Sequence, residues 1–171
     1  MLGGILSDIT AIKSQFCHNL GEELSMIILA SASPRRRELL QQIGCSFRVK
    51  VSQAEEVDCQ GLQPSVVVEK NAYLKAKAVA TLYPDMPVLG ADTVVSLDDD
   101  IFGKPKDKEQ AREMLTRLSG RTHQVSTGIA IAWHNQIWQA YETTEVDFAP
   151  LSPAEIDRYL ATGEHADKAG A

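Results

Sequence analysis

Small hydroxyl residues followed directly by arginines give the first chemical signal in this sequence. Ser33 and Pro34 stand between the apolar run Ile27–Ala30 and the basic run Arg35–Arg37. Serine followed by proline is typical of a helix N-cap and first turn, where free backbone N–H groups and the positive end of the helix dipole attract anions. Arginine adds bidentate donors for phosphate oxygens. The stretch therefore predicts a site for a phosphorylated ligand, while an ordinary strand–loop–helix with solvated arginines is the alternative.

Carboxylates and lysines in apolar or small-residue surroundings give the second signal. Asp92 interrupts the apolar run 87–95, where a charge without a partner or a metal is costly. The other residues of this kind are Glu55, Glu56, Lys75, Lys104, Asp167 and Lys168. Phosphoanhydride hydrolysis needs cations to neutralise the phosphates, a carboxylate to hold a divalent metal and another to deprotonate water. The combination therefore indicates a phosphohydrolase.

The composition is typical of one globular domain and is compatible with a small anionic ligand. Of the 171 residues, 44% are apolar and 23% are charged, and the net charge is −6. This acidic balance argues against a nucleic-acid partner, and no apolar run approaches the ~20 residues that span a bilayer. The 3 cysteines, without a C-x-x-C motif, indicate reduced thiols and no zinc site. We therefore expect a cytoplasmic protein without nucleic-acid or membrane partners.

Alternating strand-like and helix-like segments predict an α/β fold that positions these residues. The expected strands are 27–30, 47–51 with one buried face, 87–95, 101–102, 124–133 and 137–148. The expected helices are 34–43, 66–83 with Ser65 as its cap, 108–120 capped by Asp107, and 153–162 opened by the capping box at Ser152. Residues 1–25 do not fit this pattern. We expect Met26 to be the true start and residues 1–25 to be an upstream addition or an appended helix.

Several short motifs follow one another in order along the chain, namely LASASPRRRELL, EKNAYLKAKAVA, VLGADTVV, GKPKD, LSGRTHQVSTG and DKAGA. Together they resemble the Maf family of nucleotide pyrophosphatases over residues 26–171, nearly without gaps. Members hydrolyse nucleoside triphosphates to the monophosphate and pyrophosphate, are regarded as house-cleaning enzymes and are linked to septum formation and division control. The resemblance implies a mixed, twisted sheet flanked by helices with a central cleft, as in inosine triphosphatase. Adjacent arginines after Ser-Pro, the Thr-His-Gln segment and DKAGA resemble the dTTP/UTP branch more than the branch acting on 7-methyl-GTP.

The resemblance also implies roles for residues that match the family's motifs. Asp92 matches the catalytic carboxylate, a general base that activates water for attack on the α-phosphate. Ser33, Arg35 and Arg36 match the phosphate-binding turn. Lys75 and Lys104 match lysines that line the same cleft. Packing or solvated roles are expected for Arg37, Lys77, His123, Cys45, Cys59, Trp133 and Trp138.

A divalent metal, Mg²⁺ or Mn²⁺, is the implied cofactor, since carboxylate and phosphate oxygens suit hard cations. Glu55 matches the acidic-loop residue that holds this metal, and Glu56 lies one position further on. A nucleoside triphosphate is the implied partner, and a homodimer is a further expectation.

The family pattern continues past DKAGA with Y-G-I-Q-G and a further strand and helix. We therefore expect residues 26–171 to be a Maf-like domain that is incomplete at its C-terminus. The alternatives are a non-catalytic nucleotide-binding or division-regulating protein, and a pyrophosphatase for a modified nucleotide such as 7-methyl-GTP.

Overall fold

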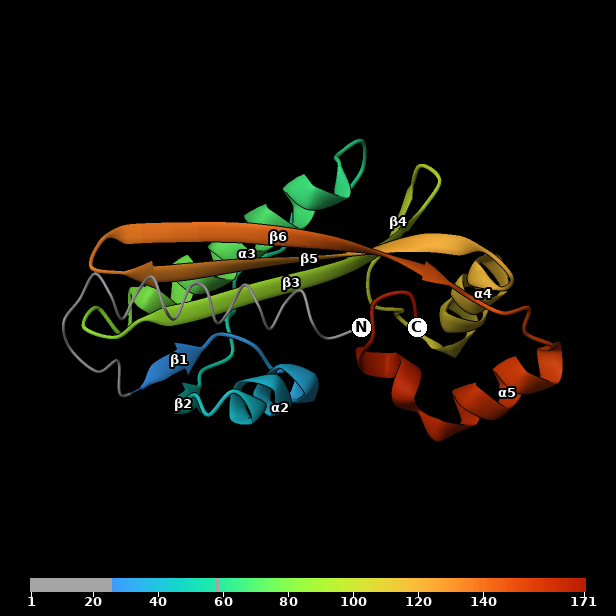
Figure 1. Cartoon of the computed structure of the whole chain (residues 1–171), viewed down its shortest axis with the longest axis horizontal. Helices are drawn as coiled ribbons and strands as arrows, with labels where there is room; N and C mark the ends of the chain where they lie inside the picture. The colour runs from blue at the N-terminus through green and yellow to red at the C-terminus, as the bar shows by residue number, and fades with distance from the viewer. Residues whose placement is uncertain (1–25, 58) are drawn as a thin grey trace.

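The strands of this protein form one mixed sheet that runs the length of the molecule (Figure 1). The structure, a computed structural model, describes residues 26–57 and 59–171. In this part of the chain the sheet has 6 strands in the order β2-β1-β3-β5-β6, with β4 paired to β3. They are β1 (Ile27–Leu29), β2 (Phe47–Val49), β3 (Val88–Leu97), β4 (Asp100–Phe102), β5 (Thr122–Trp133) and β6 (Gln136–Asp147). The predicted α/β fold with a mixed sheet is confirmed.

The sheet changes from parallel to antiparallel pairing at β3. Strand β1 pairs in parallel with β2 and with β3, whereas β4, β5 and β6 join by antiparallel pairs. The contact between β1 and β3 is short, because only Ile28–Val88 and Leu29–Leu89 are in register. Between Leu89 and Val95, where pairing with β4 begins, this edge of β3 has no strand partner among the residues described.

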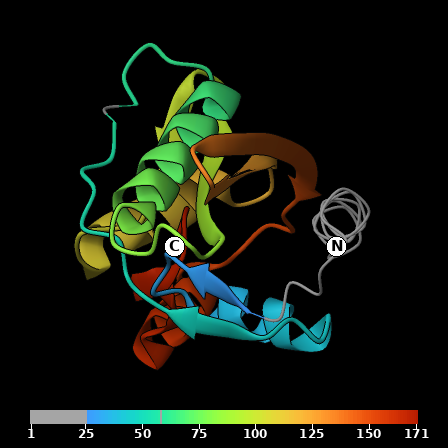
Figure 2. The same cartoon turned by 90° about the vertical axis from the view of Figure 1, so that its left-hand side faces the viewer.

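Helices lie on both faces of the sheet. They are α2 (Pro34–Gln42), α3 (Pro64–Ala80), α4 (Lys108–Leu118) and α5 (Pro153–Thr162), followed by the short 3₁₀ helix η1 (Glu164–Asp167). Leu40 of α2 packs with Leu89 and Ala91, whereas α3 covers the opposite face through Ala72 and Ala76, and Figure 2 shows the two helices on either side of the strands. Helices α4 and α5 pack on each other near the far end of the sheet.

Helix α3 lies unusually close to the sheet because two glycines face it. A Cβ atom on Gly90 would lie 2.3 Å from the carbonyl oxygen of Ala72, and one on Gly128 would lie 2.5 Å from the carbonyl of Val68. Gly128 stands opposite Asp92 in the β3–β5 register. Side chains alternate along a strand, so Asp92 shares the face of Gly90 and lies under α3.

Two of the predicted caps form as expected. The Asp107 carboxylate accepts from the N–H of Gln110 at 2.8 Å. Ser152 and Glu155 form a complete capping box at the start of α5. Both caps depend only on residues next to one another in sequence, which is why the pattern identifies them.

Other local predictions need correction. Helix α3 begins at Pro64 with Gln63 as its N-cap, not at Ser65, because proline suits the first helical position. Ser33 is the N-cap of α2, but its hydroxyl makes no capping hydrogen bond. Strand β2 ends at Val49, and its expected buried face is missing because Val49 and Val51 are exposed. A 3₁₀ turn, η1, forms where no further element was expected.

The prediction for residues 1–25 falls outside the described part of the chain. In the part that is described, no helix combines the length and apolarity needed to cross a membrane.

Candidate active site

Asp92 is the buried carboxylate around which the site is built. Its residue is 7% exposed, and it lies in the middle of β3. One carboxylate oxygen, Oδ1, accepts from Lys75 Nζ at 2.6 Å, and the other, Oδ2, accepts from Asn71 Nδ2 at 2.9 Å. A cation and an amide donor therefore compensate for the lost hydration of this charge.

Lys75 bridges two carboxylates. Its Nζ lies 2.6 Å from Asp92 Oδ1 and 2.7 Å from Glu56 Oε1. The Lys75 and Asp92 side chains are mostly buried, whereas that of Glu56 is 59% exposed. The pair with Asp92 is thus the shielded one, and the pair with Glu56 lies at the solvent edge.

The Arg36 side chain lies along the edge of β3, just past the residues that pair with β1. Its Nη1 donates to Ser31 Oγ and to the Ala91 carbonyl, both at 2.9 Å, and its Nη2 donates to Thr93 Oγ1 at 3.1 Å. Burial lowers the pKa of Arg36 below its ordinary value, and the negative charge of Asp92 opposes this shift. Arginine keeps its charge under such shifts, so Arg36 places a cation close to the buried carboxylate.

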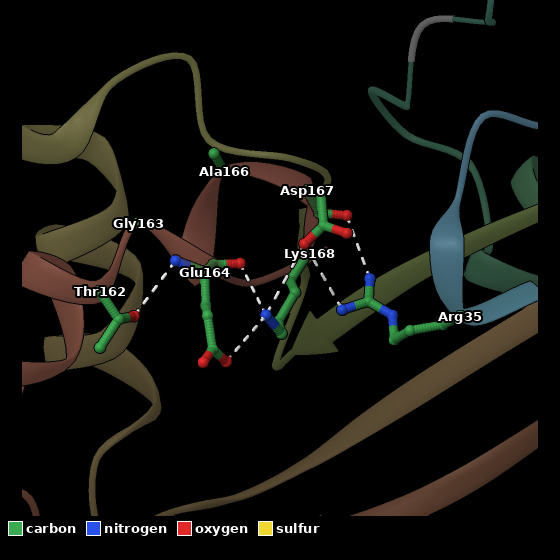
Figure 3. Close-up of a pocket in the computed structure, with 7 residues that line it drawn as sticks. All are labelled: Arg35, Thr162, Gly163, Glu164, Ala166, Asp167 and Lys168. Carbon is green, nitrogen blue, oxygen red and sulfur yellow. Dashed lines mark hydrogen bonds and ion pairs between the residues drawn. The ribbon is translucent and has the colours of Figure 1, made fainter. Parts of the chain in front are cut away.

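Arg35, which precedes Arg36 in the sequence, points toward the C-terminal turn and not toward β3 (Figure 3). Its Nη2 donates to the Asp167 carbonyl at 3.1 Å, and its Nη1 lies 3.6 Å from Asp167 Oδ1. An open cavity of about 500 Å³ lies here, lined by Arg35, Thr162, Gly163, Glu164, Ala166, Asp167 and Lys168. The Gly170 N–H donates to the Gly103 carbonyl at 3.0 Å, which brings the end of the chain beside the segment that carries Lys104.

The structure brings some of the predicted residues together and leaves others apart. Lys75 contacts Asp92, and Arg36 lies within its electrostatic reach. Glu55 and Lys104 are exposed, and within residues 26–57 and 59–171 neither is joined to Asp92 by a hydrogen bond or ion pair. The acidic-loop residue that does reach the cluster is Glu56, through Lys75.

The sequence motifs did not identify Asn71 and Thr93 as residues of the site. Asn71 is a polar residue on the otherwise apolar inner face of α3, beside Val67, Val68 and Ala72. It also precedes Lys75 by one helical turn, so the two side chains share a face. That combination was the available signal for Asn71, whereas Thr93 reads as an ordinary strand residue.

The residues present fit a hard divalent cation. No group of three or more His, Cys, Asp or Glu side chains gathers in the described part of the chain, but Asp92 and Glu56 flank one cationic position, which Lys75 Nζ takes. Mg²⁺ and Mn²⁺ are commonly held by one or two carboxylates, with water and substrate phosphates completing the coordination. The carboxylates of Asp92 and Glu56 are suitable ligands, and so is that of Glu55, which lies next to Glu56 in the loop.

His123 has the packing surroundings expected for it. The residue is buried, and its ring meets the ring of Phe148 edge-on with centroids 4.7 Å apart. Lys77, also expected to lie apart from the site, donates to the hydroxyl of Tyr73 on the outer side of α3.

The mixed sheet, with a buried carboxylate among lysine and arginine side chains, defines an α/β protein suited to a phosphorylated ligand. The same fold occurs in the Ham1 protein of Staphylococcus aureus, with a TM-score of 0.51 over 71% of each chain at 18% identity. Residues 26–171 match the model of the Maf-like protein family, and the chain belongs to this family.

Relatives of this chain are named dTTP/UTP pyrophosphatase. One from Symbiobacterium thermophilum is 49% identical over 148 residues, which are 86% of this chain and 76% of that protein. Others are 48% identical in Bacillus cereus, over 88% of this chain and 74% of that protein, and 46% identical in Yersinia pestis, over 86% and 76%.

Proposed function

We propose that this protein is a nucleoside triphosphate pyrophosphatase that hydrolyses dTTP and UTP to the monophosphate and pyrophosphate. Its relatives at 46–49% identity carry that name. The observation that carries the proposal is the position of Asp92, a buried carboxylate held by Lys75 and Asn71 beside the Arg36 cation. A cytoplasmic location accords with the cysteine usage, and a homodimer is the assembly to be tested by sedimentation.

In the proposed reaction Asp92 acts as the general base. It takes a proton from water, the water oxygen bonds to the α-phosphorus, and the bond from that phosphorus to the bridging oxygen breaks, so that pyrophosphate leaves. The triphosphate charge is neutralised by the cationic side chains of Lys75, Arg35, Arg36 and Lys104. Ser33 lies at the turn that holds the phosphates. A divalent metal, for which we propose Glu55 as a ligand, supplies further charge neutralisation when bound.

Release of pyrophosphate from dTTP and UTP with Mg²⁺ or Mn²⁺ tests this function. We expect turnover by the wild type and a loss of about 100-fold or more in Asp92→Asn, since general-base catalysis contributes roughly that much. The control nucleotides are 7-methyl-GTP and dATP. Preference for 7-methyl-GTP would assign a modified nucleotide as substrate, and dTTP binding without turnover would identify a non-catalytic nucleotide-binding protein.

A further inference from the structure

We propose that Asn71 is a positioning residue that fixes the distance between the general base and the acidic loop. The inference rests on the proposed function, because it concerns the same carboxylate, Asp92. Asn71 is 2% exposed. Its Nδ2 donates to Asp92 Oδ2 at 2.9 Å, and its Oδ1 accepts from the N–H of Val57 at 2.9 Å. A single buried amide thus joins strand β3, helix α3 and the loop that carries Glu55 and Glu56.

The two partners fix the orientation of the amide. The Val57 backbone nitrogen can only donate, so the amide oxygen of Asn71 must face it and the amide nitrogen must face Asp92. Lys75 Nζ is also only a donor, and it occupies the other oxygen of Asp92. Both carboxylate oxygens therefore face donors, which restrains the rotamer of Asp92.

Asn71 also makes the better shielded of two polar contacts between the loop and α3, which accompany the packing of Val57 against Val67 and Val68. The other contact is the ion pair of Glu56 with Lys75, in which the glutamate side chain is 59% exposed. Exposed ion pairs contribute little, because water screens them and two long side chains must be ordered. The bond from Val57 to Asn71 ends on a buried amide, so its loss leaves polar groups unsatisfied. Of the two polar contacts, we therefore assign the larger part in holding the loop to Asn71.

Two substitutions separate the halves of this role. Asn71→Leu keeps the branched shape and the number of side-chain heavy atoms, and it removes both bonds. Asn71→Asp keeps an oxygen for the Val57 N–H but replaces the donor to Asp92 with a second negative charge. Residues that orient a ligating or reacting group typically change affinity or activity by about 10- to 100-fold when they are lost.

We expect Asn71→Leu to lower both kcat and Mn²⁺ affinity, measured by titration calorimetry, by about 10- to 100-fold. Hydrogen exchange in residues 51–57 should become faster in this variant. Asn71→Asp should lower kcat while the loop keeps its protection. The matched control is Val79→Ala, which removes buried packing from the same helix against Ile28 and Val88 without touching Asp92. An Asn71→Leu protein whose kcat loss is no larger than that of Val79→Ala at equal loss of thermal midpoint would overturn the proposal.

A measurement on the wild-type fold keeps the proposal testable if both Asn71 variants fail to fold. The chain has only 3 asparagines, Asn19, Asn71 and Asn135, so selective ¹⁵N labelling gives few side-chain amide signals. We expect the Asn71 amide protons to exchange slowly and to shift in Asp92→Asn. Fast exchange with no shift would overturn the tie to Asp92. This result does not depend on turnover, so it is separate from the failure of the proposed function, which absence of pyrophosphate release by the wild type would show.

Discussion

At the scale of single residues, the site depends on how one buried carboxylate is compensated. Asp92 and Lys75 are both largely removed from water, so each makes burial of the other tolerable. Glu56 contacts the same ammonium group from an exposed position. Both carboxylates pair with the Lys75 ammonium group. The pairing compensates for lost hydration at Asp92, whereas Glu56 remains hydrated.

Lys75→Met should therefore destabilise the fold by about 3 kcal/mol, because it leaves the Asp92 charge buried without its cation. Glu56→Gln should cost less than about 1 kcal/mol, since that carboxylate remains hydrated. Urea unfolding of both variants at neutral pH measures the difference. Equal midpoints for the two would show that Asp92 does not depend on Lys75.

Individual residues also show where sequence reasoning stops. The pairing of Lys75 with Asp92 accords with motifs that place both at one site, and the caps at Asp107 and Ser152 follow from neighbouring residues. Glu55 and Glu56 lie in a loop, where no hydrophobic period sets which side chain points inward. Only the tertiary contact with Lys75 distinguishes them, and it selects Glu56.

At the scale of elements, the close contact between α3 and the sheet positions the side chains of the candidate site. Gly90 and Gly128 leave room for the helix backbone, so the side chains of Asn71 and Lys75 reach down to Asp92. A sequence shows these residues only as glycines within strands, which equally indicate a bulge or a weak strand. The helix that requires them is distant in sequence and could not be inferred from their neighbours.

Gly128→Ala should force α3 away from the sheet, since its Cβ would lie 2.5 Å from the Val68 carbonyl. We expect a loss of stability of about 1–3 kcal/mol or more and a fall in kcat, measured by urea unfolding and pyrophosphate release. Gly103→Ala is the matched control, because a Cβ there would meet nothing within 4 Å. If the two variants behaved alike, close approach of the helix would not matter.

Helix α5 provides a prediction about pH. Hydrogen bonds from Ser152 lower the pKa of Glu155 below its ordinary value of 4.5. A carboxyl whose pKa is lowered by folding stabilises the protein above its unfolded pKa, and this contribution disappears as the pH falls through the lowered value. Ser152→Ala should cost about 1 kcal/mol at neutral pH and less below pH 4.5. Urea unfolding across this range checks the trend, and an effect that grows toward acid pH would contradict it.

At the scale of the whole molecule, strand β3 is the common support of the site. Helix α3 sends Asn71 and Lys75 to it from one face, and α2 sends Arg36 to its edge. The C-terminal segment reaches the same strand, because Ala169 and Ala171 pack against the cluster that contains Val95 and Leu97. Segments from the beginning, middle and end of the described chain therefore meet at one strand. The sequence pattern predicted the general α/β class, but it did not predict that these segments meet at β3.

The early end of the β1–β3 pairing has a consequence for solubility. An uncovered strand edge is a template on which other chains can add as extra strands. In this protein a side chain covers part of that edge between the β1 and β4 pairings, because Arg36 donates to the Ala91 carbonyl and to the Thr93 hydroxyl. Any event that withdraws the Arg36 guanidinium from β3, whether substitution or capture by a bound anion, opens a short stretch of backbone to self-association. The residue that carries charge to the site thus also occupies part of a strand edge that is otherwise open to pairing with another chain.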